Sequence, residues 1–147
     1  MTQLKTTLWQ AIDTLVAQLP FSKAKVETAL GTPLREVDRN TYTVFLESAD
    51  AVQLADNERI AKIDLRLGSE QAHPGLLSLD LEGGCINLDA VRAHYSNLKI
   101  TDIPRGRSLD EATTHSAALP WGKLSFGFRE RAPNCLAYVV LAPGEGD

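Results

Sequence analysis

Residues 60–67 (IAKIDLRL) and 77–82 (LSLDLE) decide the fold, because apolar and polar side chains alternate along most of both segments. Successive side chains of a β-strand point to opposite faces, so this pattern predicts strands with one face on a core and one in water. The link between the two segments is too short for a crossover helix, which indicates antiparallel pairing.

Toward the N-terminus, residues 1–31 are predicted to form a helical hairpin. Apolar residues recur at intervals of three and four over residues 4–19, which is one face of an α-helix. Ser22 is typical of a residue that begins a second helix, and Gly31 of one that ends it.

Toward the C-terminus, a third helix is predicted over residues 87–97. The sheet that contains it spans 41–142, with further strands at 41–47, 99–103, 124–128 and 136–141. We therefore predict an α+β fold in one domain, residues 1–147. The hairpin and the third helix would pack on one face of a mainly antiparallel, five- to six-stranded sheet.

Composition and charge exclude several classes of function. Leu, Ile, Val and Phe supply 39 of the 147 residues, which is enough for a folded core. The formal charge of −4 is spread evenly, without a basic arm, so we expect no nucleic-acid partner. No apolar run approaches the roughly 20 residues of a membrane helix, so we expect no membrane partner. A native Met1 would predict a cytoplasmic protein, and a removed signal peptide a periplasmic one.

Two cysteines, Cys85 and Cys135, lie beside predicted strands. We expect two half-buried thiols, with a single disulfide as the alternative in an oxidising compartment. Cys85 directly precedes the third predicted helix, whose dipole would favour a thiolate, so with a histidine it could act as a nucleophile. The histidines lack the spacing of a metal site, and no phosphate-binding glycine motif occurs. No metal, cofactor or catalytic residue is therefore predicted.

Four charged residues would line the water-facing side of the predicted sheet: Asp64, Arg66, Asp80 and Glu82. Charge pairing between neighbouring strands is the simplest explanation for them. Because no helix is predicted over this face, another protein could also cover it. We therefore include these residues in a predicted partner-binding set.

The rest of that set lies in and around residues 108–121. This segment has only a weak apolar stripe, so we predict a connection with one or two helical turns. Connections of this length are often functional, and arginine and tryptophan dominate many protein interfaces. The partner-binding residues predicted here are Arg105, Arg107, His115, Trp121 and Arg129.

A resemblance to a known class covers residues 85–142. The residues that carry it are His94-Tyr95, PRGRSLDEAT (104–113), WGKLSFGF (121–128) and Cys135-Leu136. This part of the chain resembles small bacterial α+β proteins of the effector-immunity kind, which include inhibitors of toxins from interbacterial secretion systems. The resemblance implies a protein without a catalytic motif, and it assigns no role to any residue.

We therefore predict a non-enzymatic protein-binding module, an immunity-type inhibitor that neutralises a bacterial toxin or enzyme. One alternative is a small hydrolase or transferase that uses Cys85. Another is a small-molecule binding protein with an apolar pocket between sheet and helices. The open sheet face could also meet a second copy of the chain in a homodimer.

Overall fold

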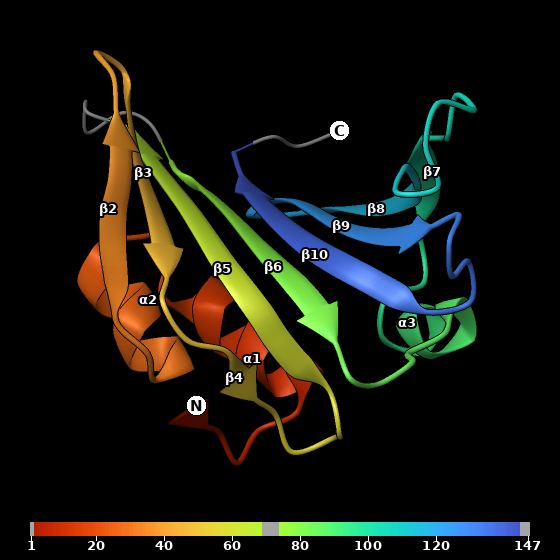
Figure 1. Ribbon diagram of the computed structural model, residues 1–147, viewed down its shortest axis with the longest axis horizontal. Helices are drawn as coiled ribbons and strands as arrows, with labels where there is room; N and C mark the ends of the chain where they lie inside the picture. Colours follow the sequence, from red (N-terminus) through yellow and green to blue (C-terminus); the bar gives the residue numbers. More distant parts are fainter. Residues whose placement is uncertain (1, 69–73, 145–147) are drawn as a thin grey trace.

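A single large sheet dominates the computed structural model, which describes residues 2–68 and 74–144 (Figure 1). The helices are α1 (Leu8–Ala17), α2 (Lys23–Leu30) and α3 (Leu88–His94). The strands are β1 (Thr2–Gln3), β2 (Leu34–Arg39), β3 (Thr43–Ser48), β4 (Val52–Gln53), β5 (Arg59–Gly68), β6 (Leu76–Glu82), β7 (Lys99–Asp102), β8 (Ala112–Leu119), β9 (Gly122–Arg129) and β10 (Leu136–Pro143).

The prediction of a five- to six-stranded sheet carrying a helical hairpin is wrong, because the described residues form ten strands in one sheet. Its main path is β2-β3-β5-β6-β10-β9-β8-β7, with antiparallel neighbours throughout. β4 pairs with the first residues of β5, and β1 runs parallel to β4, so the sheet is mixed. β10 lies between β6 and β9 and joins the earlier strands to the later ones.

Two strands that sequence reasoning missed account for much of this difference. β2 is an edge strand whose residues are exposed after Leu34, so it needs no apolar alternation. β8 lies inside the sheet, but its sequence, ATTHSAAL, contains mainly small residues. The neighbouring strand β9 supplies the large buried side chains Leu124, Phe126 and Phe128 instead. Because the side chains of β9 fill the core beside it, β8 can consist of small residues and so shows only a weak apolar pattern.

The positions of the three helices are confirmed, with shorter bounds. Thr7 begins α1 through a capping box, in which its hydroxyl accepts from the Gln10 N–H and the Gln10 side chain accepts from the Thr7 N–H. Ser22 and Asn87 cap α2 and α3, and Gly31 ends α2 with a φ of 68°. No helix in the described part of the chain is long and apolar enough to cross a membrane.

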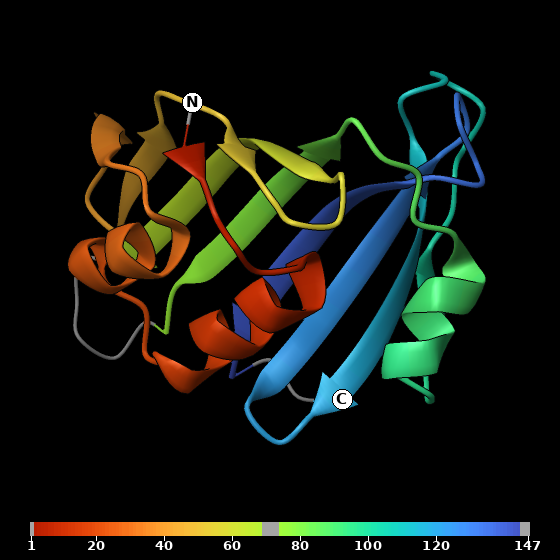
Figure 2. The same cartoon turned by 90° about the horizontal axis from the view of Figure 1, so that it is seen from below.

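The helices lie on one face of the sheet, with α1 and α2 across the strands and α3 beside β8 (Figure 2). Leu79, Val139 and Phe126 stand opposite one another on β6, β10 and β9, point into this core and are fully buried. Each such side chain stabilises the fold by about 1.5–3 kcal/mol. The Trp9 ring of α1 stacks on the His94 ring of α3, with 4.1 Å between centroids, and so ties these helices together. We call the opposite side of the sheet the helix-free face.

Candidate interaction surface

The predicted sheet residues lie together on the helix-free face. Asp64 and Arg66 belong to β5, Asp80 and Glu82 to β6, and Arg129 ends β9. Each of the five follows a buried residue, so each points away from the core. The predicted orientation of these side chains is confirmed, whereas their role in binding stays a prediction.

Most of the charges in this part of the sheet are paired with one another. Ion pairs join Arg59 with Glu82, Lys62 with Glu47, and Arg66 with Asp64. The Arg66 guanidinium also lies 5.3 Å from the centroid of the Phe45 ring. Exposed ion pairs of this kind contribute about 0–1 kcal/mol each to stability. The surface of β3, β5 and β6, which we call the charged half, is therefore largely self-complementary.

Beyond β6 the helix-free face changes, because Tyr138 of β10 lies over Gly127 of β9. A β-carbon at Gly127 would come within 2.0 Å of the ring atom Cζ, so the ring occupies the space that a side chain would need. The Tyr138 hydroxyl lies 2.8 Å from the Thr114 hydroxyl, and the Arg129 guanidinium lies 5.6 Å from the ring centroid. Arg129 is therefore positioned by an aromatic ring.

A row of hydroxyl groups crosses three adjacent strands beside this tyrosine. The Thr101 and Ser116 oxygens are 2.8 Å apart, and the Ser116 and Ser125 oxygens are 2.7 Å apart. Ser116 and Ser125 are only 5% and 6% exposed, although no helix covers this face. We call the surface of β7, β8 and β9 on this face the hydroxyl half, and Arg129 is its one residue that was predicted to belong to a site.

The segment 108–121 is not the predicted connection, because β8 occupies most of it. The strand separates Arg107 from Trp121 by roughly 26 Å of extended chain. His115 points to the core side and is 8% exposed, so the prediction that it is a surface contact is wrong. Burial, followed by the positive charge of Arg92, lowers the pKa of His115 and favours its neutral form.

Trp121 lies in the turn between β8 and β9, half-buried against the core. The next residue, Gly122, has a φ of 151°, and a β-carbon there would lie 2.4 Å from the Ala142 carbonyl oxygen. The turn is therefore tightly packed against β10. Trp121 therefore contributes to packing, and its role in binding a partner stays a prediction.

Arg105 and Arg107 lie in the loop between β7 and β8, residues 103–111. Both donate their backbone N–H to the Glu111 carboxylate, the Arg107 N–H at 2.8 Å. These N–H groups, that of Arg107 most strongly, hold the pKa of Glu111 below its usual range. The Arg105 guanidinium lies 3.5 Å from an Asp102 carboxylate oxygen, whereas that of Arg107 has no ion pair within the described residues. Arg107 is therefore the predicted residue best placed to meet a partner.

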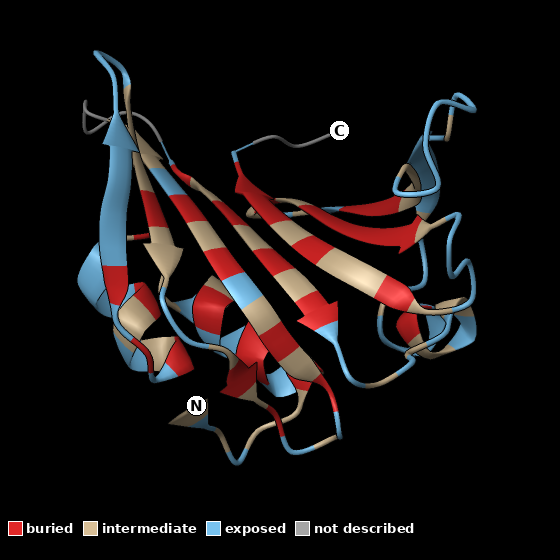
Figure 3. Ribbon diagram, in the orientation of Figure 1, coloured by how far each residue is buried: buried red, intermediate tan, exposed pale blue. Residues whose placement is uncertain are grey.

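Three large apolar side chains surround this arginine in the sequence. Ile100, Ile103 and Leu109 are 59%, 59% and 55% exposed, and they stand out among the apolar side chains in the described part of the chain. Ile100 lies in β7, and Ile103 and Leu109 lie in the loop 103–111, which projects from the sheet at the upper right of Figure 3. We call Ile100, Ile103, Arg107 and Leu109 the β7–β8 patch. Sequence reasoning missed its apolar members, although isolated apolar residues in a polar, aperiodic segment were a usable signal.

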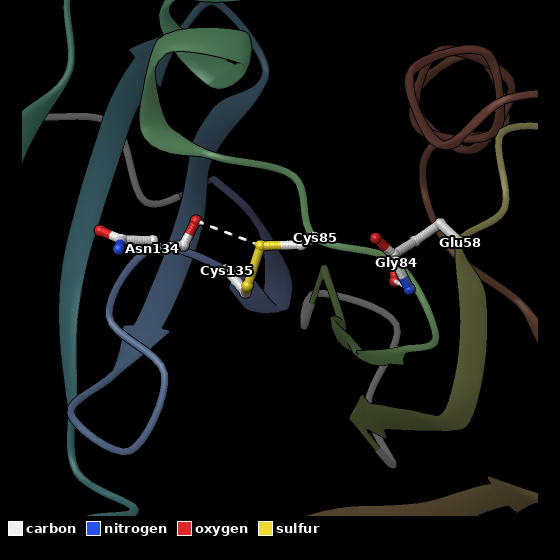
Figure 4. Close-up of a disulfide and its surroundings, with 5 residues drawn as sticks. All are labelled: Glu58, Gly84, Cys85, Asn134 and Cys135. Carbon is white, nitrogen blue, oxygen red and sulfur yellow. Dashed lines mark hydrogen bonds between the residues drawn. A yellow bond between two sulfur atoms is a disulfide. The ribbon is translucent and has the colours of Figure 1, made fainter.

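Cys85 and Cys135 form a disulfide with 4.5 Å between their α-carbons, so the expectation of two free thiols is wrong (Figure 4). The Cys85 sulfur lies 3.6 Å from the Asn134 carbonyl oxygen. Beside the bond, the Leu136 N–H donates to the Ile86 carbonyl at 2.7 Å. The segment before α3 is thus fixed to the loop before β10. The nucleophile in cysteine chemistry is the thiolate, which Cys85 lacks in this state.

Glu58 is a buried carboxylate that sequence reasoning did not single out. It is 1% exposed and accepts the Gly84 N–H at 3.4 Å (Figure 4). Its second oxygen, Oε2, has no hydrogen-bond partner among the described residues. Burial raises the pKa of Glu58 and the Asp56 charge raises it further, while the N–H groups of Gly84 and Arg59 act against the shift. This carboxyl is therefore poorly suited to carry a charge.

No group of three or more His, Cys, Asp or Glu side chains within residues 2–68 and 74–144 could hold a metal ion. Comparison with known protein families, characterised proteins and solved structures finds nothing that matches this chain. A function is therefore inferred from the chain's own residues.

Proposed function

We propose that this protein binds another protein through the β7–β8 patch and is an inhibitor of the immunity kind rather than an enzyme. The observation that carries the proposal is the exposure of Ile100, Ile103 and Leu109, each more than half exposed. Removing apolar surface from water gains about 25 cal/mol per Å². Single exposed apolar residues are ordinary, but three within ten residues support a contact surface.

Arg107 supplies specificity to this patch. A guanidinium can donate two parallel hydrogen bonds to a carboxylate, and arginine is enriched among the residues that dominate binding energy. Because Glu111 holds the backbone of the loop, the patch loses little conformational freedom on binding. A partner with an apolar surface and a nearby carboxylate would therefore fit it.

The edge of β7 itself is poorly suited to accept an added strand. Its register with β8 shifts between Ile100 and Asp102, and its four residues include Lys99 and Asp102. Irregular pairing and charged side chains discourage the pairing of a further strand. We therefore assign binding to the side chains of the patch.

The test is copurification from a lysate of the source cells, with the tagged wild-type protein and two variants compared. Ile103→Asp places a charge in the patch, whereas Tyr42→Asp is a matched control at a side chain that is 75% exposed in the β2–β3 turn. We expect one stoichiometric partner with the wild type and Tyr42→Asp, and about tenfold less with Ile103→Asp. Equal recovery with all three proteins, each shown to be folded by circular dichroism, would contradict the proposal.

A further inference from the structure

We propose that the Cys85–Cys135 disulfide is a redox switch that controls partner binding at the β7–β8 patch. The oxidised form keeps the patch in its binding conformation, and reduction loosens it. This inference rests on the proposed function, because it describes the regulation of the same patch. The disulfide lies outside the patch, so its effect must pass through the segments between them.

The loop between β9 and β10, residues 130–135, connects the disulfide to the loop 103–111. Two backbone hydrogen bonds fold this connecting loop on itself. The Ala132 N–H donates to the Arg129 carbonyl at 3.0 Å, and the Cys135 N–H donates to the Ala132 carbonyl at 3.1 Å. The loop is therefore a compact unit with the disulfide at one end.

The other end of this unit holds the loop of the patch. The Glu130 N–H donates to the Glu111 carbonyl and the Arg131 N–H to the Leu109 carbonyl, each at 2.9 Å. The Arg131 Nε also donates to the Asp110 carboxylate at 3.0 Å. The two loops lie side by side at the upper right of Figure 2. Leu109 belongs to the β7–β8 patch, so the backbone of the patch is bonded directly to the loop that the disulfide anchors.

Packing contributes little to the position of these two loops. Every residue of 103–111 and of 130–135 is exposed or half-buried. Segments with few buried contacts open locally at a small cost in free energy, so a covalent anchor has a large influence on them. Beside the disulfide, the hydrogen bond from the Leu136 N–H to the Ile86 carbonyl does not involve the sulfur atoms. Reduction is therefore expected to loosen the loops without unfolding the sheet.

The disulfide is open to a reductant. Cys85 is exposed and Cys135 is half-buried, and a hollow of about 210 Å³ lies beside Cys135 (Figure 4). The co-reactant is a dithiol, whose thiolate attacks the Cys85 sulfur, breaks the disulfide and releases Cys135 as a thiolate that takes up a proton. The second thiol then breaks the mixed disulfide and releases Cys85 in the same way. The protein gains two electrons and two protons, and the dithiol becomes a disulfide.

The experiment is hydrogen exchange of the ¹⁵N-labelled full chain by NMR, oxidised or reduced with dithiothreitol. Mass gain with iodoacetamide checks reduction, and circular dichroism checks folding. We expect the Glu130 and Arg131 amides to exchange about tenfold faster after reduction. The Tyr42 and Thr43 amides, which donate to the Asn40 side chain in the exposed β2–β3 turn, should not change. Equal rates for Glu130 and Arg131 in both forms, or an equal rise in the β2–β3 turn, would overturn the proposal.

The double variant Cys85→Ser with Cys135→Ser tests the same coupling without a reductant. It imitates the reduced form, so its Glu130 and Arg131 amides should exchange as they do in the reduced wild type. Dithiothreitol should not change these rates further. A double variant that exchanges like the oxidised wild type would contradict the switch.

A second variant keeps the disulfide and weakens only the contact between the loops. Asp110→Ala removes the ion pair with Arg131 and should speed the exchange of the Arg131 amide about twofold. Glu36→Ala is the matched control, because it removes an exposed ion pair with Arg39 in β2. If Glu36→Ala speeds the exchange of Arg131 as much as Asp110→Ala does, the loops are not coupled as proposed.

Partner recovery separates the switch from the proposed function. From a lysate of the source cells, the tagged double-serine variant should recover about fivefold less partner than the wild type, because loosened loops lose more freedom on binding. Equal recovery by these two proteins, with less by Ile103→Asp, would overturn the switch and leave the proposed function intact. Equal recovery by all three proteins would overturn the proposed function and the switch with it.

Discussion

The charged half and the hydroxyl half of the helix-free face belong to one sheet but use their side chains differently. In the charged half, Lys62 forms an ion pair with Glu47 and Arg59 with Glu82, so the charges of this surface neutralise one another. In the β7–β8 patch, next to the hydroxyl half, Arg107 has no ion pair among the described residues and three large apolar side chains are exposed. The charged half therefore leaves few unpaired groups for a partner, and this difference is why we propose binding at the β7–β8 patch instead.

Loss of the disulfide should have the largest effect on stability, because the disulfide ties the end of the charged half to the loop before β10. Replacing Cys85 and Cys135 together by serine opens a link between residues 50 positions apart. The free energy of unfolding should fall by about 3–4 kcal/mol, because the unfolded chain regains loop freedom. Urea unfolding followed by circular dichroism measures the loss.

A reductant supplies the control for this prediction. The wild type in reductant should approach the stability of the double-serine variant, and that variant should not respond to reductant. Unchanged stability in both cases would show that the disulfide does not hold the two halves together.

Single substitutions in the two halves should destabilise the protein to different extents. Ser116→Ala leaves the buried Ser125 hydroxyl without its partner and should cost about 1–2 kcal/mol of unfolding free energy. Lys62→Gln removes an exposed ion pair and should cost less than about 0.5 kcal/mol. Equal losses in urea unfolding would mean that the exposed charges matter as much as the buried hydroxyls.

Glu58 gives a smaller effect with a defined pH dependence. Its pKa is raised in the folded state, so the protonated form is stabilised by folding. This contribution is complete below the unfolded pKa and is lost as pH rises through the folded pKa. Glu58→Gln keeps an acceptor for the Gly84 N–H without the charge, and it should stabilise the protein by about 1 kcal/mol at pH 8.

Thermal unfolding between pH 4 and pH 8 measures this effect. The gain from Glu58→Gln should shrink toward pH 4, where the wild-type carboxyl is protonated. Glu130→Gln, at an exposed carboxylate, is the control and should show no such trend. A gain that is equal at both pH values would assign the effect to packing instead of charge.

Much of the secondary structure could be predicted from the sequence, because local patterns determine it. Ser22 and Asn87 begin helices because their side chains accept hydrogen bonds from backbone N–H groups. Gly31 ends α2 because glycine readily adopts a positive φ. The alternation around Ile63 and Leu79 also identified the core side of β5 and β6. The extent of the sheet could not be predicted, because neither β2, an exposed edge strand, nor β8, a strand of small residues beside β9, shows the apolar alternation of a half-buried strand.

The candidate site was predictable only in part for the same reason. The outward direction of Asp64 and Arg66 follows from strand alternation, but their mutual pairing depends on geometry. The prediction for His115 is wrong because the small residues of β8 do not show the alternation of a strand, so the sequence does not show which side His115 faces. Burial of Ser116 depends on neighbouring strands that are distant in sequence, and no local pattern records it.

The place of β10 between β6 and β9 also affects how the chain acquires its structure during synthesis. Leu77 and Leu79 of β6 pair with Leu141 and Val139, which lie 64 and 60 positions later in the sequence. Until the last strand leaves the ribosome, β6 therefore remains an open, leucine-rich edge. Non-local pairing of this kind slows folding and leaves the nascent chain prone to aggregation. Loss of β10 would leave β6 and β9 without the strand that joins them, even though all three helices precede β10 in the sequence.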